Sequence, residues 1–306
     1  MKRKIGLSIF DFQKKYDEKK SIELAKKAGA DAVDLNLCGE NYDYRNPKSI
    51  YSKSDEEICA YFKSVGEYAR EIGMEITQTH GRIEGYKNIK EEDEALLANA
   101  RIDCMATAAM GCGICVMHSV TTIFLGPDAE PELYRDLNYK MFTEILRYAK
   151  QYGVKIATET FGDAARFNCC DFFGNIDEFI NSYNRVCATE DFRDYFITCV
   201  DTGHSNKAMR FNGNPTPADV IRMLGSSIGV LHLHDNDTLT DQHKVPMTGC
   251  IDWEDVLCAL DEVGYKGVYN MEVVLGCFGE GIEEETAAYA VTVMRNMLKN
   301  HYGDEA

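Results

Sequence analysis

Short apolar runs alternate with longer amphipathic segments along the whole chain. The apolar runs, such as Ala32–Leu37, have the length of buried strands. The segments between them place apolar residues at helical spacing and carry helix signals at their ends. Pro131 and Gly153 bracket one such segment, and Thr216 precedes another. Because no linker or low-complexity stretch interrupts the alternation, we expect one domain over residues 1–306.

The pattern predicts eight strands and eight helices. The strands are expected at Lys4–Phe10, Ala32–Leu37, Met74–His80, Ile114–His118, Lys155–Thr160, Tyr195–Val200, Ile228–His234 and Gly267–Val273. The helices are expected at Ser21–Ala28, Asp55–Ile72, Glu91–Met110, Pro131–Tyr152, Ile176–Cys187, Pro217–Leu224, Trp253–Val263 and Ile282–Leu298. Eight such units predict an α/β fold, a single (β/α)8 TIM barrel. No G-x-G-x-x-G motif follows the first strand, which counts against a dinucleotide-binding fold.

One stretch, Val230 to His243, is unusually rich in histidine and aspartate. It reads V-L-H-L-H-D-N-D-T-L-T-D-Q-H, and strand alternation places His232 and His234 on the same face. Taken alone, the stretch is equally compatible with a polar loop holding structural histidines and with a divalent-metal site. The ends of the other strands decide between the two.

Six consecutive strands end in residues able to bind a metal, at the end where a barrel carries its chemistry. These residues are His80, His118, Glu159, Asp201, His234 and Glu272. Burying a carboxylate such as Glu159 or Glu272 between apolar neighbours is costly unless a cation pairs with it or a proton neutralises it. Six such positions at one end of the sheet favour a functional site.

The chemistry of these donors suits a transition metal. Glu159, Asp201, His234 and Glu272 offer three oxygen ligands and one nitrogen, a mixture that binds Mn²⁺, Fe²⁺, Co²⁺ or Zn²⁺. Such an ion polarises a carbonyl and stabilises an enediolate. Glu159 and Glu272 are the expected catalytic acid and base, moving a proton between carbons or between faces of one carbon. This is the chemistry of aldose–ketose isomerisation and of epimerisation.

Composition and charge narrow the setting. The formal net charge of −17 disfavours non-specific binding to nucleic acid, which needs cationic surfaces. No apolar run is long enough to span a membrane. The 12 cysteines lie mostly in apolar runs, and the start of the sequence does not have the pattern of a signal peptide. We therefore expect reduced, buried thiols in a cytoplasmic protein. For the C-x-x-C pair Cys112 and Cys115, small-residue packing is favoured over a redox or zinc role.

The strand ends resemble those of the xylose isomerase-like barrel superfamily, over nearly the whole chain. The similar motifs are A-T-E-T, V-D-T-G-H, H-L-H-D-N-D followed by D-Q-H, P-M-T-G-C-I-D-W and N-M-E. The resemblance implies that Glu159, Asp201, His234 and Glu272 are central ligands and that His232 is a supporting or core residue. Met247 stands where the family usually has glycine, so that loop is expected to differ.

The resemblance implies a metal-dependent enzyme but several activities. A sugar or sugar-phosphate isomerase or epimerase is the first expectation, with Mn²⁺ or Zn²⁺, or else Co²⁺, Fe²⁺ or Mg²⁺, in one or more ions. Endonuclease IV, which cleaves abasic DNA, has a similar full ligand set, and a C-glycoside-cleaving lyase would use the same acid–base pair. A metal-free binding protein fits poorly. The further metal or substrate ligands implied are His80, His118, His204, Asp241 and His243.

Substrate recognition and assembly are less well defined. Arg166 and Lys244 are candidate substrate-binding residues, although a surface position for Arg166 is the simpler interpretation. The family's ketohexose epimerases carry an arginine shortly after the ligand of the seventh strand, whereas this chain offers Lys244. The expected partner is a small carbohydrate rather than nucleic acid or membrane, and the resemblance is compatible with a homo-oligomer.

Overall fold

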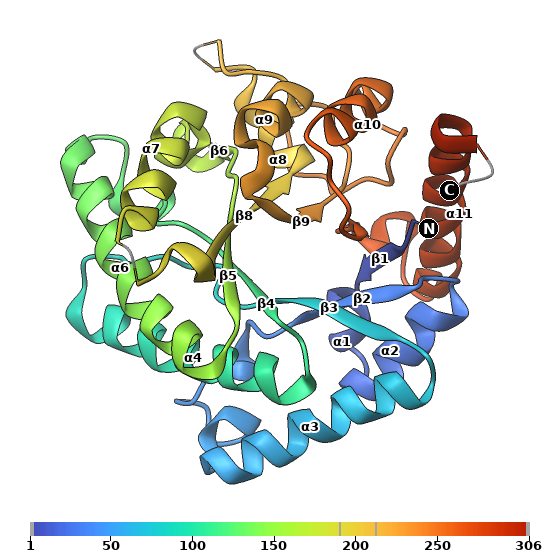
Figure 1. Ribbon diagram of the computed structural model, residues 1–306, viewed down its shortest axis with the longest axis horizontal. Helices are drawn as coiled ribbons and strands as arrows, with labels where there is room; N and C mark the ends of the chain where they lie inside the picture. Colours follow the sequence, from blue (N-terminus) through green and yellow to red (C-terminus); the bar gives the residue numbers. More distant parts are fainter. Residues whose placement is uncertain (1–2, 190, 212, 304–306) are drawn as a thin grey trace. The chain divides into compact units, whose positions relative to one another are not determined.

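Eight parallel strands form one sheet in the computed structural model, which describes residues 3–189, 191–211 and 213–303 (Figure 1). Their order is β10-β1-β2-β3-β4-β5-β8-β9, that of a (β/α)8 barrel, which confirms the predicted fold class. The strands are β1 (Ile5–Ser8), β2 (Ala32–Asn36), β3 (Glu75–His80), β4 (Ile114–Met117), β5 (Lys155–Glu159), β8 (Phe196–Asp201), β9 (Ile228–His232) and β10 (Tyr269–Met271). A separate antiparallel hairpin pairs β6 (Asp163–Ala164) with β7 (Cys169–Cys170).

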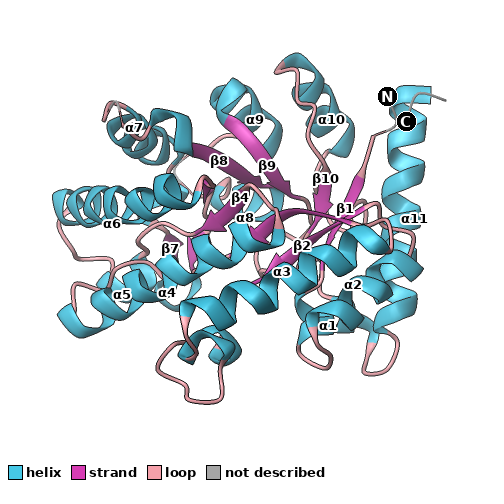
Figure 2. Cartoon of the chain, turned by 60° about the horizontal axis from the view of Figure 1, so that its bottom comes forward, coloured by secondary structure: helices cyan, strands magenta, loops and turns pink. Residues whose placement is uncertain are grey.

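Helices connect the strands (Figure 2). They are α1 (Phe10–Gln13), α2 (Glu18–Lys27), α3 (Asp55–Glu71), α4 (Lys90–Met110), α5 (Thr122–Leu125), α6 (Pro131–Tyr152), α7 (Ile176–Cys187), α8 (Thr202–Ala208), α9 (Pro217–Leu224), α10 (Trp253–Glu262) and α11 (Glu283–Tyr302). Within the described ranges, each helix is too short or too polar to cross a lipid bilayer.

Side chains and glycines at the helix ends explain several boundaries. Thr216 accepts a hydrogen bond from the Asp219 amide at the start of α9, and Asp252 accepts one from Asp255 at the start of α10. Ser54 and Glu57 form a reciprocal capping box before α3. Gly153 ends α6 in the left-handed conformation, as its position after the helix predicts.

The described residues fall into two compact units. Unit 1 contains residues 3–36, 68–77, 199–211 and 213–303. In it, β1 lies between β10 and β2, with Leu7 paired to both Met271 and Val33. Leu233, just after β9, bridges to Met271. This register places His234 and Glu272 at adjacent positions, one residue further along their chains.

Unit 2 contains residues 37–67, 78–189 and 191–198. Its strands pair in the order β3-β4-β5, with His80 opposite Val116 and Met117 opposite Thr158. The next residues along the last two strands are His118 and Glu159, so register alone makes them neighbours. The long helices α4 and α6 lie side by side in this unit (Figures 1 and 2).

The structure differs from the predicted elements at several strand ends, and two of these differences place a short helix directly after a strand. The first strand ends at Ser8, and Phe10–Gln13 turns into the short helix α1. After β8 the chain enters helix α8 at once, where the sequence pattern predicts no helix. Asp201 caps α8 by accepting a hydrogen bond of 2.6 Å from the His204 amide. A seven-residue helix is too short to show a periodic pattern, so only the cap identifies it.

A glycine in the middle of α3 permits close helix packing in unit 2. A Cβ atom at Gly66 would overlap the backbone carbonyl of Met110 at the end of α4. We predict that Gly66→Ala lowers the free energy of unfolding by about 1–3 kcal/mol, because backbone cannot yield as a side-chain tip does. Chemical denaturation measures the change.

Gly113→Ala is the matched control, since a Cβ atom there meets no atom within 4 Å. The helix propensity of alanine alone would stabilise α3 by about 1 kcal/mol. A Gly66→Ala variant as stable as wild type, or more so, would contradict the packing argument.

Candidate metal centres

Unit 2 brings together three of the predicted donors. His80 ends β3, His118 follows β4, and Glu159 ends β5. The Glu159 Oε2 atom lies 3.4 Å from His80 Nε2 and 3.2 Å from His118 Nε2. Glu159 is completely buried, and the two imidazole rings stand edge to face with centroids 5.1 Å apart. We call these three residues the Glu159 group.

Unit 1 brings together a second set of predicted donors, just beyond the carboxyl ends of β8 and β9. His204 lies in α8, and Asp241 and His243 lie in the loop after β9. The Asp241 Oδ2 atom is 3.5 Å from both His204 Nε2 and His243 Nε2. We call these three residues the Asp241 group. One ligand atom from each, together with one from His234, lies within 4.8 Å of all the others.

The distances between ligand atoms in both groups fit an ion with tetrahedral coordination. Ligand atoms about 2.1 Å from Zn²⁺ at tetrahedral angles lie about 3.4 Å apart. The observed separations of 3.2–3.5 Å bracket that value. Each group supplies two imidazoles and one carboxylate, a donor set that also suits other transition metals. The residues present therefore fit a divalent ion.

His234 pairs with Asp201 between the strand ends of unit 1. Its Nε2 atom is 2.9 Å from Asp201 Oδ1, and both side chains are completely buried. The His234 ring stacks on His243, with centroids 3.8 Å apart. A Cβ atom at Gly203 would overlap the His234 ring, so the glycine of V-D-T-G-H makes room for that ring. Thr202 fixes the backbone by donating a hydrogen bond of 2.8 Å to the His234 carbonyl.

Glu272 lies at one end of a series of polar contacts that runs through His232 to Asp34. The His232 Nδ1 atom lies 3.4 Å from Glu272 Oε2, and its Nε2 atom lies 2.9 Å from Asp34 Oδ2. His232 and Asp34 are completely buried, whereas the Glu272 side chain is 21% exposed. His232 thus lies between the Glu272 carboxylate and Asp34, and its supporting role stays a prediction. Sequence reasoning missed Asp34, whose signal was a lone acid inside the apolar run A-V-D-L-N.

Other polar residues of the motif have structural partners. Asp235 accepts hydrogen bonds from the Trp253 indole (2.8 Å) and the Ile251 amide (3.1 Å), which ties the I-D-W segment to the end of β9. Asp237 accepts bonds from the Leu239 and Thr240 amides. The density of acids in this stretch therefore overstates the number of metal donors.

Electrostatics within the Asp241 group favour a charged carboxylate. Burial raises the pKa of Asp241, but the charges and hydrogen bonds of His204 and His243 outweigh it and hold the pKa below its ordinary range. Burial lowers the pKa of His243, yet Asp241 and Glu272 raise it to about 9. The group thus attracts positive charge.

Lys207 is a further cation beside this group that sequence reasoning missed. It lies one helical turn after His204 in α8, and its side chain is only 6% exposed. Its ammonium nitrogen is 3.6 Å from Asp241 Oδ1. Since α8 was not predicted, the shared helix face of His204 and Lys207 could not be recognised from sequence.

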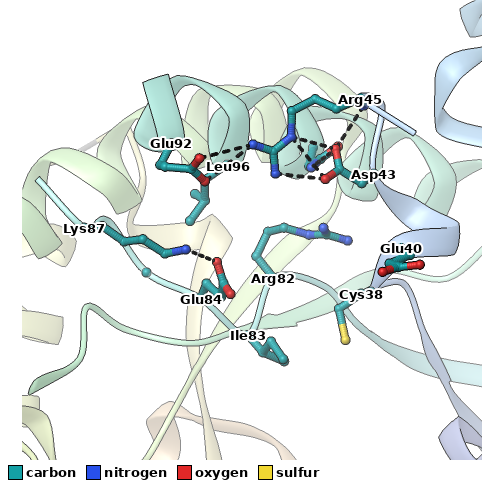
Figure 3. A pocket seen from close by; sticks show the side chains of 13 residues that line it. Cys38, Glu40, Asp43, Arg45, Arg82, Ile83, Glu84, Lys87, Glu92 and Leu96 are labelled. Carbon is teal, nitrogen blue, oxygen red and sulfur yellow. Dashed lines mark hydrogen bonds and ion pairs between the residues drawn. The ribbon is translucent and has the colours of Figure 1, made fainter. Parts of the chain in front are cut away.

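A pocket of about 270 Å³ with several charged side chains in its wall lies in unit 2, among the loops after β2 and β3 and the start of α4 (Figure 3). Arg45 lines it, bound to Asp43 at 2.9 Å and to Glu92 at 3.4 Å. Arg82 lines it too, and its carbonyl accepts a hydrogen bond from the His118 amide. The pocket wall is thus continuous in backbone with the Glu159 group. Its mixed cations and carboxylates can bond the hydroxyl groups of a polar ligand.

The two candidate substrate residues lie in different settings. Arg166 is exposed, and its guanidinium lies 4.7 Å from the centre of the Phe167 ring. Lys244 is half-buried, and its backbone exchanges two hydrogen bonds of 2.9 Å with Asp235. Their substrate roles stay predictions.

Known proteins show similar sequences and folds. The family model described as xylose isomerase-like TIM barrel matches residues 22–297. An inosose isomerase of Bacillus velezensis is 22% identical over 294 residues, 94% of each chain. An uncharacterised protein of Methanocaldococcus jannaschii is 30% identical over 158 residues, or 49% of this chain. The chain spans about half the length of that relative and of another from Sinorhizobium fredii.

Solved structures show the same fold. The IOLI protein with a bound zinc atom gives a TM-score of 0.73 at 16% identity, over 98% of this chain and 99% of that chain. A D-tagatose 3-epimerase-like protein gives 0.69 at 19% identity, over 99% of this chain and 100% of that chain. The match of the family model over residues 22–297 establishes that the chain belongs to the xylose isomerase-like TIM barrel family.

Proposed function

We propose that this chain is a divalent-metal-dependent isomerase or epimerase of a sugar, a sugar phosphate or a related polyol. The observation that carries the proposal is the donor spacing in the Glu159 group and the Asp241 group, where a carboxylate oxygen lies 3.2–3.5 Å from two imidazole nitrogens. The similarity to an inosose isomerase and to a D-tagatose 3-epimerase-like protein supports the reaction class.

Asp201, His234 and Glu272 are the proposed metal ligands of unit 1. The buried Asp201–His234 pair offers an oxygen and a nitrogen, and register sets Glu272 beside His234. Glu159 is the proposed ligand from unit 2; its membership of the same centre stays a prediction from sequence. Zn²⁺ and Mn²⁺ are the proposed ions, and the zinc in the IOLI structure supports the former. A bound ion would polarise a substrate carbonyl and stabilise the negative charge left by a departing proton.

Glu272 is proposed to move the proton. The contact with His232 holds its carboxylate, and its partial exposure leaves a path to a ligand. Asp34 accepts a hydrogen bond from the Nε2 atom of His232, and this contact fixes the orientation of the ring. Glu159 is the proposed second acid–base group, because a carboxylate that is completely buried exchanges protons with a bound ligand rather than with water.

A phosphodiesterase acting on abasic DNA is the second candidate. The presence of both three-residue groups favours it, because phosphoryl transfer commonly uses clustered metal ions. The net charge of −17 counts against it, since a DNA-binding face needs cations to replace counterions. Incubation with abasic duplex DNA and with a panel of ketoses, inososes and sugar phosphates separates the two functions.

We predict that Glu272→Gln lowers turnover at least about 10³-fold while the fold survives, because the amide cannot accept the proton. Deuterium incorporation from D₂O into the converted sugar, followed by NMR, measures the loss. The exposed Glu280→Gln is the control. Turnover of Glu272→Gln at the wild-type level would rule out the acid–base role.

We predict that the purified protein carries at least one equivalent of divalent metal. Dialysis against a strong chelator should remove both metal and activity, and Mn²⁺ or Zn²⁺ should restore them, because the imidazole and carboxylate donors remain in place. Elemental analysis and the turnover assay follow the two quantities. A folded protein that neither contains nor takes up metal would contradict the proposal.

We predict that Gly203→Ala weakens zinc binding about 10- to 100-fold, because the added methyl group displaces the His234 ring from Asp201. Titration against a competing zinc indicator measures the affinity, and circular dichroism checks the fold. Gly276→Ala is the matched control, since a Cβ atom there meets nothing within 4 Å. An unchanged affinity in Gly203→Ala would remove His234 from the ligand set.

A further inference from the structure

Lys207 is a buried cation whose position no step of the proposed chemistry uses. Lysine is almost never buried without a charge partner, and the side chain here is only 6% exposed. It shares a helix with His204, three residues earlier, and faces the same carboxylate as that histidine. The placement suggests a function within the Asp241 group rather than on the surface.

The two oxygens of Asp241 face different cations. Its Oδ2 atom lies 3.5 Å from His204 Nε2 and from His243 Nε2, at the spacing of metal ligands. Its Oδ1 atom lies 3.6 Å from the Lys207 ammonium. A divalent ion among the three ligands would therefore share its carboxylate with a positive charge already in place. Like charges that share one anion at short range weaken each other's binding.

In unit 2, the basic side chain that follows the donor His80 binds an acid outside its donor group. Arg82 follows His80 by two residues, but its guanidinium bonds Asp103, with Nε 2.8 Å from Oδ2, and the Leu37 carbonyl. The Asp103 carboxylate also accepts a hydrogen bond of 2.7 Å from Tyr51. The Arg82 guanidinium thus binds an acid outside the Glu159 group, whereas the Lys207 ammonium lies beside an acid of the donor group itself.

We propose that Lys207 acts as a built-in monovalent cation for Asp241 and lowers the divalent-metal affinity of the Asp241 group. The Asp241 group then takes up its divalent ion only after the other donor sites are filled. At low free metal the Lys207 ammonium, instead of an ion, offsets the charge of Asp241. The inference rests on the proposed function, because it presupposes divalent-metal binding by this chain. Lys207, which is not among the predicted ligands, thereby influences how many metal ions the protein binds.

Zinc loading of three forms tests the inference. Wild type, Lys207→Met and Lys207→Arg are equilibrated with zinc buffers of stepped free concentration, and bound zinc per chain is measured by elemental analysis. Lys207→Met should bind one further equivalent at a free zinc concentration about 10- to 100-fold lower than wild type requires. Lys207→Arg keeps the charge and should load like wild type. Lys207→Gln replaces Lys207→Met if circular dichroism shows that variant to be unfolded.

The double variant Lys207→Met/His204→Ala locates the effect. It should lose the gained equivalent, because His204 is a donor of the Asp241 group. Equal loading of wild type and Lys207→Met, or a gain that survives His204→Ala, would overturn the inference while leaving the metal-dependent function standing. Absence of zinc from every form, wild type included, would instead overturn the proposed function, so the two failures are distinguishable.

Discussion

Buried carboxylates facing imidazoles at the ends of parallel strands are the constraint around which this structure is arranged. Glu159 and Asp201 are completely buried, and removing such charges from water costs several kcal/mol unless positive charge meets them. Neutral imidazoles orient a carboxylate but do not neutralise it. These two carboxylates are therefore stable as ionised ligands only with a cation nearby, which a divalent ion or a protonated histidine can supply.

Strand register does most of the positioning, and small residues do the rest. Pairing of Met117 with Thr158 makes His118 and Glu159 neighbours without any special loop, and the Leu233–Met271 bridge does the same for His234 and Glu272. Where a side chain must cross between elements, a glycine makes room, as Gly203 does for the His234 ring. The donors at the strand ends are thus placed by the sheet, whereas Asp241 and His243 depend on the loop after β9.

The sequence predicts this framework well because its signals are local and repeated. Apolar runs, caps such as Thr216 and Asp252, and donors at successive strand ends can all be recognised from neighbouring residues. The fold class was confirmed by the strand order. The partners of the donors could not be predicted, because they arise from contacts far apart in the chain. Asp34 meets His232 across 198 positions, and Lys207 reaches Asp241 only because α8 forms.

The donors alone do not choose a reaction, since the same ligands suit carbonyl and phosphodiester chemistry. The choice must come from what surrounds a ligand once it is bound. The pocket in unit 2 pairs Arg45 with Asp43 and Glu92, leaving a wall of alternating charge rather than a cationic groove. Such a wall can donate and accept hydrogen bonds with hydroxyl groups, but it offers a polyanion as much repulsion as attraction. Together with the net charge of −17, this favours a small hydroxylated substrate over a nucleic acid backbone.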